Sequence, residues 1–151
     1  MNRWAAWLIR CGAVAVLAVS AGAVTPAQSS RRVLDGVYTD AQAGRGLALY
    51  KQHCGYCHRD DLTGGGSEAG APALAGPVFI YRWLGQPVAD VFLEIGLTMP
   101  KNKPDTLTPQ VVADIVSFLL KSNEMPAGKS ELPADLEALK LITMTEPPPG
   151  R

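Results

Sequence analysis

The sequence predicts an all-α domain, and three stretches carry that prediction. Apolar residues recur at helical spacing from Thr39 to the cysteine motif at 54–58, from Pro87 to Ile95, and from Thr108 to Lys121. The sequence shows no βαβ pattern around them. A length of 151 residues fits one compact domain. We therefore expect a single body with three main helices.

The first predicted helix begins with a capping box. Gln42 follows Thr39 at three residues, so the hydroxyl and the amide are each expected to bond a backbone N–H at the helix start. Gly46 and Tyr50 lie on one face of this helix, where Tyr50 is expected to pack in the core. A helical glycine costs about 1 kcal/mol relative to alanine. Gly46 on a buried face therefore predicts the close approach of another helix.

The second and third predicted helices have recognisable ends. Pro87 suits a first helical position and Gly96 a C-terminal stop. In the third helix Thr108 is the expected cap and Pro109 the first residue. The apolar face of the second helix consists of Val88, Val91, Phe92 and Ile95. The polar stripe of the third consists of Gln110, Asp114, Ser117 and Lys121, and the rest of that helix is a wide apolar face.

The motif Cys54-Gly55-Tyr56-Cys57-His58 is the attachment signature of a c-type haem. Two thiols on one short turn can each add to a vinyl group of the porphyrin, and the adjacent imidazole can coordinate the iron. The alternatives are a thioredoxin-like redox pair and half of a zinc site. The first wants a βαβ context, and the second wants further ligands, for which the sequence offers His53 and no later cysteine.

Several elements in the same order make residues 43–121 resemble a single-haem cytochrome c of the small soluble, bacterial class. They are Gly46 and Tyr50 before the motif, Pro72 and Leu74 after it, Thr98-Met99-Pro100, and Phe118 in the last helix. The resemblance implies a small cytochrome c fold with three core helices around one haem c, bound through two thioethers to Cys54 and Cys57. It also implies that an aromatic of the last helix packs near Gly46.

The resemblance also implies roles for the residues after the motif. The Pro72 carbonyl would accept the Nδ1–H of His58 and raise its basicity, and Leu74 would pack on the haem face. An ordinary proline turn is the alternative. Among Tyr81, Arg82 and Trp83, the partner of the haem propionates is left open.

Met99 is the expected sixth ligand beside His58. A thioether is a soft, neutral ligand that stabilises ferrous iron and raises the reduction potential. The alternative is that Met99 fills the core, as methionine often does. Met125, Met144 and His53 are weaker candidates for the ligand position.

The chain divides into four predicted parts. Residues 1–27 predict a signal peptide, with Arg3 and Arg10 before an uncharged, mostly apolar run of 14 residues from Cys11 to Val24. An uncleaved anchor is the alternative, although a span needs about 20 residues. Residues 28–38 predict a linker, 39–123 the cytochrome domain, and 124–151 an extension with a short helix over 133–142 and a disordered proline tail. Export predicts a periplasmic protein without stable membrane insertion after cleavage.

Charge and ligands together predict an electron carrier and not an enzyme. The formal net charge is zero, which argues against nucleic-acid binding. Removing Arg3 and Arg10 leaves 12 basic against 14 acidic residues. Lys101 and Lys103 beside Met99 either steer an acidic partner or are ordinary solvated surface. The expected partners are redox proteins, a dehydrogenase or an oxidase, met by a monomer or in transient complexes. The alternatives are a subunit fixed to a quinoprotein-type dehydrogenase, and a sensor or peroxidase-like protein with open iron.

Overall fold

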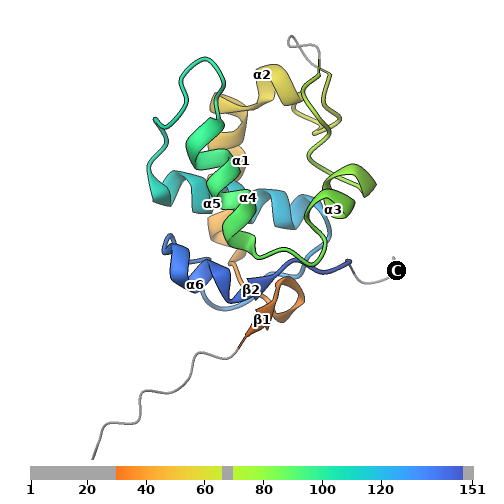
Figure 1. Ribbon diagram of the computed structural model, residues 1–151, viewed down its shortest axis with the longest axis vertical. Coiled ribbons are helices and arrows are strands. Elements are labelled where there is room, and N and C mark those ends of the chain that lie inside the picture. The colour runs from red at the N-terminus through yellow and green to blue at the C-terminus, as the bar shows by residue number, and fades with distance from the viewer. Residues whose placement is uncertain (1–29, 66–69, 148–151) are drawn as a thin grey trace, which may run out of the picture.

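A computed structural model describes residues 30–65 and 70–147 (Figure 1). The predicted signal peptide, with Cys11, and residues 148–151 of the predicted tail lie outside these ranges. The helices are α1 (Asp40–His53), α2 (Gly55–His58), α3 (Pro77–Trp83), α4 (Val88–Thr98), α5 (Pro109–Ser122) and α6 (Leu136–Lys140). Around them lie the 3-10 helix η1 (Val33–Asp35) and the short strands β1 (Arg31–Arg32) and β2 (Ile142–Thr143). The all-α prediction is confirmed. Within the described ranges, no helix has the length and apolarity that a bilayer crossing requires.

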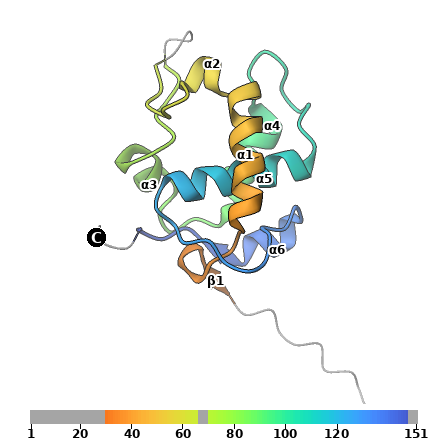
Figure 2. The same cartoon turned by 180° about the vertical axis from the view of Figure 1, so that it is seen from behind.

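Helices α1 and α5 cross at the centre of the molecule (Figure 1), and the crossing is seen from behind in Figure 2. A Cβ atom added to Gly46 would collide with the Asp114 carbonyl oxygen and lie 2.9 Å from the Cβ of Phe118. The rings of Tyr50 and Phe118 pack beside this point, with centroids 5.1 Å apart. The predicted close approach at Gly46 is confirmed. The caps predicted for α5 are also present, because Thr108 Oγ1 accepts from the Val111 N–H.

Two helices differ from the sequence prediction. Helix α4 continues through Gly96 to Thr98, and Pro87 is its cap instead of its first residue. The helix stops at Met99, whose extended backbone is the conformation that a following proline favours. Helix α3 has no counterpart among the predicted helices. It starts with Pro77 after a glycine, and it is too short for a 3.6-residue pattern to stand out.

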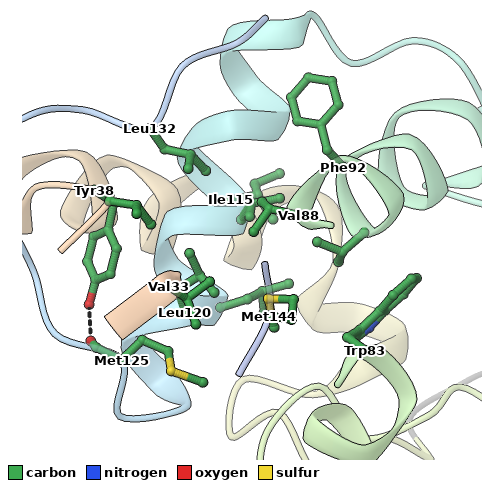
Figure 3. Close-up of a cluster of buried hydrophobic side chains, with 14 of the residues drawn as sticks. Val33, Tyr38, Trp83, Val88, Phe92, Ile115, Leu120, Met125, Leu132 and Met144 are labelled. Atoms are coloured by element: carbon green, nitrogen blue, oxygen red, sulfur yellow. Dashed lines mark hydrogen bonds between the residues drawn. The ribbon is translucent and has the colours of Figure 1, made fainter. Parts of the chain in front are cut away.

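Residues 31–38 are not a linker in the structure. Strand β1 pairs in parallel with β2, Arg31 opposite Ile142. Val33, Val37 and Tyr38 have at most 1% of their surface exposed. The Tyr38 hydroxyl donates to the carbonyl oxygen of Met125 at 2.6 Å, and both residues appear in the buried cluster of Figure 3. The segment lacks periodicity because it combines two extended residues with a 3-10 turn, so its apolar residues gave no recognisable signal.

The C-terminal segment, defined as residues 124–147, adds a second layer of core beneath α1, α4 and α5. Its most deeply buried side chains are Met125, Leu132, Leu139, Ile142 and Met144. Figure 3 shows Leu132 and Met144 on either side of Leu120 and Ile115 of α5. Helix α6 lies inside the predicted range 133–142, capped by Asp135, which accepts from the Ala138 N–H at 2.8 Å. Met144 therefore belongs to the core and not to a loose tail.

Only one half of the predicted capping box is present, because the Gln42 side chain bonds elsewhere. The Thr39 hydroxyl does accept from the Gln42 N–H at 3.1 Å, as expected. The Gln42 side chain, however, is completely buried and binds the backbone of Leu132 through two hydrogen bonds of 3.0 and 2.7 Å. The amide thus fastens the C-terminal segment to α1.

Candidate cofactor site

The two cysteines and His58 lie where α1 gives way to α2: Cys54 joins the two helices, and Cys57 and His58 belong to α2. Helix α1 ends at His53, and the Cys54 N–H caps it by donating to the Tyr50 carbonyl at 2.8 Å. The N–H groups of Cys57 and His58 both donate to the Cys54 carbonyl, at 3.1 and 3.0 Å. The chain therefore turns tightly here, and both cysteines are half-buried.

His58 is buried, with 8% of its surface exposed. Its Nδ1 lies 2.9 Å from the carbonyl oxygen of Pro72. A carbonyl oxygen can only accept, so Nδ1 carries a proton, and in the neutral ring Nε2 then has the lone pair that a metal ligand needs.

Residues 62–65 hold the segment that contains Pro72. The Leu74 N–H donates to the Leu62 carbonyl, and the Gly65 N–H to the Ala71 carbonyl, each at 2.8 Å. Gly64 has a φ of +72°, and a Cβ there would lie 2.5 Å from the Ala71 carbonyl oxygen. Glycine at position 64 therefore permits this close approach. Gly66 lies outside the described residues.

One cavity of about 700 Å³ brings the predicted site residues together. Its lining includes Cys54, Cys57, His58, Pro72, Leu74 and Met99. Apolar side chains of α3, α4 and α5 complete the walls, among them Phe79, Val91, Ile115 and Leu119. The volume falls within the range of about 300–1,000 Å³ that is usual for cofactor sites. Met125 and Met144, the other candidate ligands, lie in the core and do not line the cavity, whereas His53 does.

The aromatic stretch contributes unequally to this cavity. Trp83 and Arg82 line it, and the guanidinium carbon of Arg82 lies 4.9 Å from the centroid of the Trp83 ring. Arg82 Nη2 is 3.6 Å from Glu94 Oε1, the only carboxylate in the lining among the described residues. Tyr81 points away, with 73% of its surface exposed, and does not line the cavity.

The chemistry of the two cysteines fits a covalent haem better than a redox pair. Burial, reinforced by the neighbouring Cys57, raises the pKa of the Cys54 thiol to about 11. Reactive cysteines of redox motifs have lowered pKa values instead. Zinc also finds no support, because the described parts of the chain contain no group of three His, Cys, Asp or Glu residues arranged to hold a metal ion. Two thiols, one oriented imidazole and one thioether around an apolar cavity are a donor set that fits haem c.

Comparison with known proteins identifies a family for this chain. The family model described as cytochrome c oxidase, cbb3-type, subunit III matches residues 41–119. No curated protein sequence matches the chain. Among solved structures, a chain of the sulfane dehydrogenase SoxCD from Paracoccus pantotrophus is similar, with a TM-score of 0.49 and 24% sequence identity. The match covers 68% of the present chain and 52% of that one, so it spans about half the length of the SoxCD chain.

Proposed function

Because the chain belongs to the c-type cytochrome family described as cytochrome c oxidase, cbb3-type, subunit III, we propose that it carries single electrons between redox proteins. Its c-type cytochrome domain binds haem c, which when bound supplies a reversible one-electron change of its iron. The observation that supports the proposal most directly is the shared cavity of His58 and Met99 beside the two cysteines. We also propose that residues 1–27 are a signal peptide and that the protein is exported to the periplasm.

Each of these residues has a separate task in the proposed carrier. Cys54 and Cys57 form the thioethers, and the tight turn at Cys54 keeps them next to His58. The Pro72 carbonyl holds the His58 ring so that Nε2 serves as the proximal ligand. Met99 would hold the iron together with His58, and no position on the iron would then stay open for small molecules. This closed ligand set is the reason to prefer a carrier over a sensor or peroxidase-like protein.

We also propose that Arg82 and Trp83 bind the carboxylates of the haem. A buried carboxylate needs hydrogen-bond donors, and these two side chains line the cavity while Tyr81 does not. The 3.6 Å contact of Arg82 with Glu94 leaves most of its guanidinium donors available. Leu74 contributes apolar surface to the same cavity.

The proposed partner is an acidic redox protein, such as a dehydrogenase or an oxidase subunit. Lys101 and Lys103 line the cavity, are exposed, and form no ion pair with any described residue. Unpaired charge at the rim of a site attracts an oppositely charged partner and accelerates the encounter. Transient redox encounters typically bury less than about 1,200 Å², so a short-lived complex is expected.

The ligand proposal is tested with a Met99→Leu variant of the exported protein. Leucine cannot ligate iron, so we expect the weak red band of methionine-ligated ferric haem to vanish and the reduction potential to fall, since a thioether favours ferrous iron. Met125→Leu is the matched control, because Met125 is a buried methionine outside the cavity. A high-spin spectrum in the unmodified protein that shifts with carbon monoxide or cyanide would overturn the carrier proposal.

The partner proposal is tested by the rate of electron exchange with two inorganic oxidants of opposite charge. Lys101→Glu should slow the reaction with hexacyanoferrate(III) several-fold relative to tris(phenanthroline)cobalt(III), and the difference should shrink as salt is added. Lys129→Glu is the control, since Lys129 is also exposed and does not line the cavity. Equal effects of the two substitutions would contradict an acidic partner at this rim.

A further inference from the structure

Asn123 ends α5 with a buried side chain that makes three hydrogen bonds. Only 4% of its surface is exposed. Its Nδ2 donates to the Leu119 carbonyl at 2.8 Å, which completes the helix end, and to the Leu74 carbonyl at 3.0 Å. Its Oδ1 accepts from the Gly76 N–H at 2.9 Å. The amide therefore ties α5 to a segment 47 to 49 residues earlier in the chain.

That segment carries the carbonyl that orients His58. Pro72, whose oxygen lies 2.9 Å from His58 Nδ1, is two residues before Leu74. The Leu74 N–H faces the other way and donates to the Leu62 carbonyl at 2.8 Å. The segment is thus fixed on one side by residues 62–65 and on the other by Asn123, which is bound to α5.

We propose that Asn123 is a positioning residue for His58, acting through Leu74, Gly76 and Pro72. The inference rests on the proposed function, in which His58 ligates the iron. A firmly held Pro72 carbonyl strengthens the Nδ1–H···O bond, raises the basicity of the imidazole and favours ferric iron. Without the amide, residues 71–76 lose their hydrogen bonds to the end of α5 and keep their backbone hydrogen bonds to residues 62–65. The bond to Nδ1 then weakens and the reduction potential becomes more positive.

A purely structural role for Asn123 would have a different signature. Loss of a buried amide that bonds the backbone lowers stability wherever it lies. Gln42 provides the comparison, because it too is a buried amide with one donated and one accepted bond to the backbone of a distant residue, Leu132. Gln42 does not line the cavity. Stability alone therefore does not distinguish the two amides, whereas the properties of His58 do.

The test compares Asn123→Leu and Asn123→Ala with Gln42→Leu in the haem-loaded protein. All three are expected to unfold at lower denaturant concentration. Only the Asn123 variants are expected to have a more positive reduction potential and a several-fold faster solvent exchange of the His58 Nδ1 proton, followed by NMR of the ferrous protein. Alanine is included because it removes the amide without adding bulk, in case leucine prevents folding.

The possible results separate the inference from the function on which it rests. The positioning role is overturned if the reduction potential and the proton-exchange rate change equally in the Asn123 and Gln42 variants. It is also overturned if they change in neither. If instead the unmodified protein shows no absorption spectrum of haem c at all, the proposed ligation of His58 fails, and this outcome is visible before any variant is made.

Discussion

Gly44 and Gly46, two residues apart in α1, have opposite surroundings. A Cβ on Gly46 would meet the Asp114 backbone and the Phe118 side chain, whereas a Cβ on Gly44 would have nothing within 4 Å. Both glycines are equally poor helix formers. The difference between them therefore lies in packing, and Gly46 is required where α5 crosses α1.

Alanine at these two positions is expected to change stability in opposite directions. Gly46→Ala forces α1 and α5 apart and should lower the free energy of unfolding by about 1–3 kcal/mol. Gly44→Ala should raise it by about 0.5–1 kcal/mol, because it only removes the conformational freedom of glycine. Denaturant unfolding of the haem-loaded protein measures both values. A Gly46→Ala variant as stable as Gly44→Ala would contradict the close helix crossing.

At the residue level, the sequence is informative where chemistry fixes the spacing of residues and uninformative where the partner of a side chain is distant. The cysteine pair and the adjacent histidine were recognisable because two thioethers and one axial ligand require neighbouring positions. Gln42 was assigned to the wrong partner, since its amide binds Leu132, 90 residues later in the chain. No sequence pattern near Gln42 indicates that contact. Likewise, none near Asn123 indicates its hydrogen bonds to Leu74 and Gly76.

At the level of elements, the middle of the predicted polar stripe of α5, Asp114 and Ser117, is buried, whereas Gln110 and Lys121 at its ends are exposed. Asp114 accepts two hydrogen bonds from Arg45 of α1, at 2.9 and 3.1 Å, and one from Gln110 at 3.0 Å. Arg45 also bonds Glu131 of the C-terminal segment at 2.9 Å. The helix pattern located these polar residues on one side correctly. It did not reveal that the middle of this side, at Asp114, is buried and bonded to Arg45 of α1.

Low pH should weaken the contact between Asp114 of α5 and Arg45 of α1. Burial by itself would raise the pKa of Asp114, but hydrogen bonds from Arg45, Gln110 and Gln42 outweigh it and hold the pKa below its ordinary value. The stabilisation is therefore complete above the unfolded pKa of about 3.9 and is lost as the pH falls through the lower folded value. We expect Asp114→Asn to be less stable than the unmodified protein at pH 7, with the difference shrinking as the pH is lowered from 5 to 2.

Unfolding followed by circular dichroism at several pH values measures this difference. Glu137→Gln is the control, because the Glu137–Lys140 pair is exposed and joins residues of the same helix. A difference between Asp114→Asn and the unmodified protein that stays constant down to pH 2 would show that the carboxylate charge contributes nothing to this contact.

At the level of the whole molecule, the N-terminal and C-terminal segments of the described chain bond to each other and complete the core. Strand β1 pairs with β2, the Gly128 N–H donates to the Tyr38 carbonyl at 2.6 Å, and the Met144 N–H donates to the Gln86 carbonyl at 2.8 Å. These contacts join segments that are 58 to 111 residues apart along the chain. Short extended segments have no helical period, so the sequence predicted a linker and an extension instead of one continuous core.

The cavity predicts how the molecule behaves without its cofactor. Protein interiors are close-packed, so a space of about 700 Å³ between α2, α3, α4 and α5 requires an occupant. In a Cys54→Ala/Cys57→Ala variant, which forms no thioether, amide hydrogen exchange over residues 59–65 and 70–83 should be at least roughly tenfold faster than in the loaded protein. The α1–α5 crossing should remain the region of slowest exchange.

Leu139→Ala, remote from the cavity, serves as the control and should lack this local pattern of faster exchange. If residues 59–65 and 70–83 stayed as protected from hydrogen exchange in the Cys54→Ala/Cys57→Ala variant as in the loaded protein, a cofactor in this cavity would be contradicted.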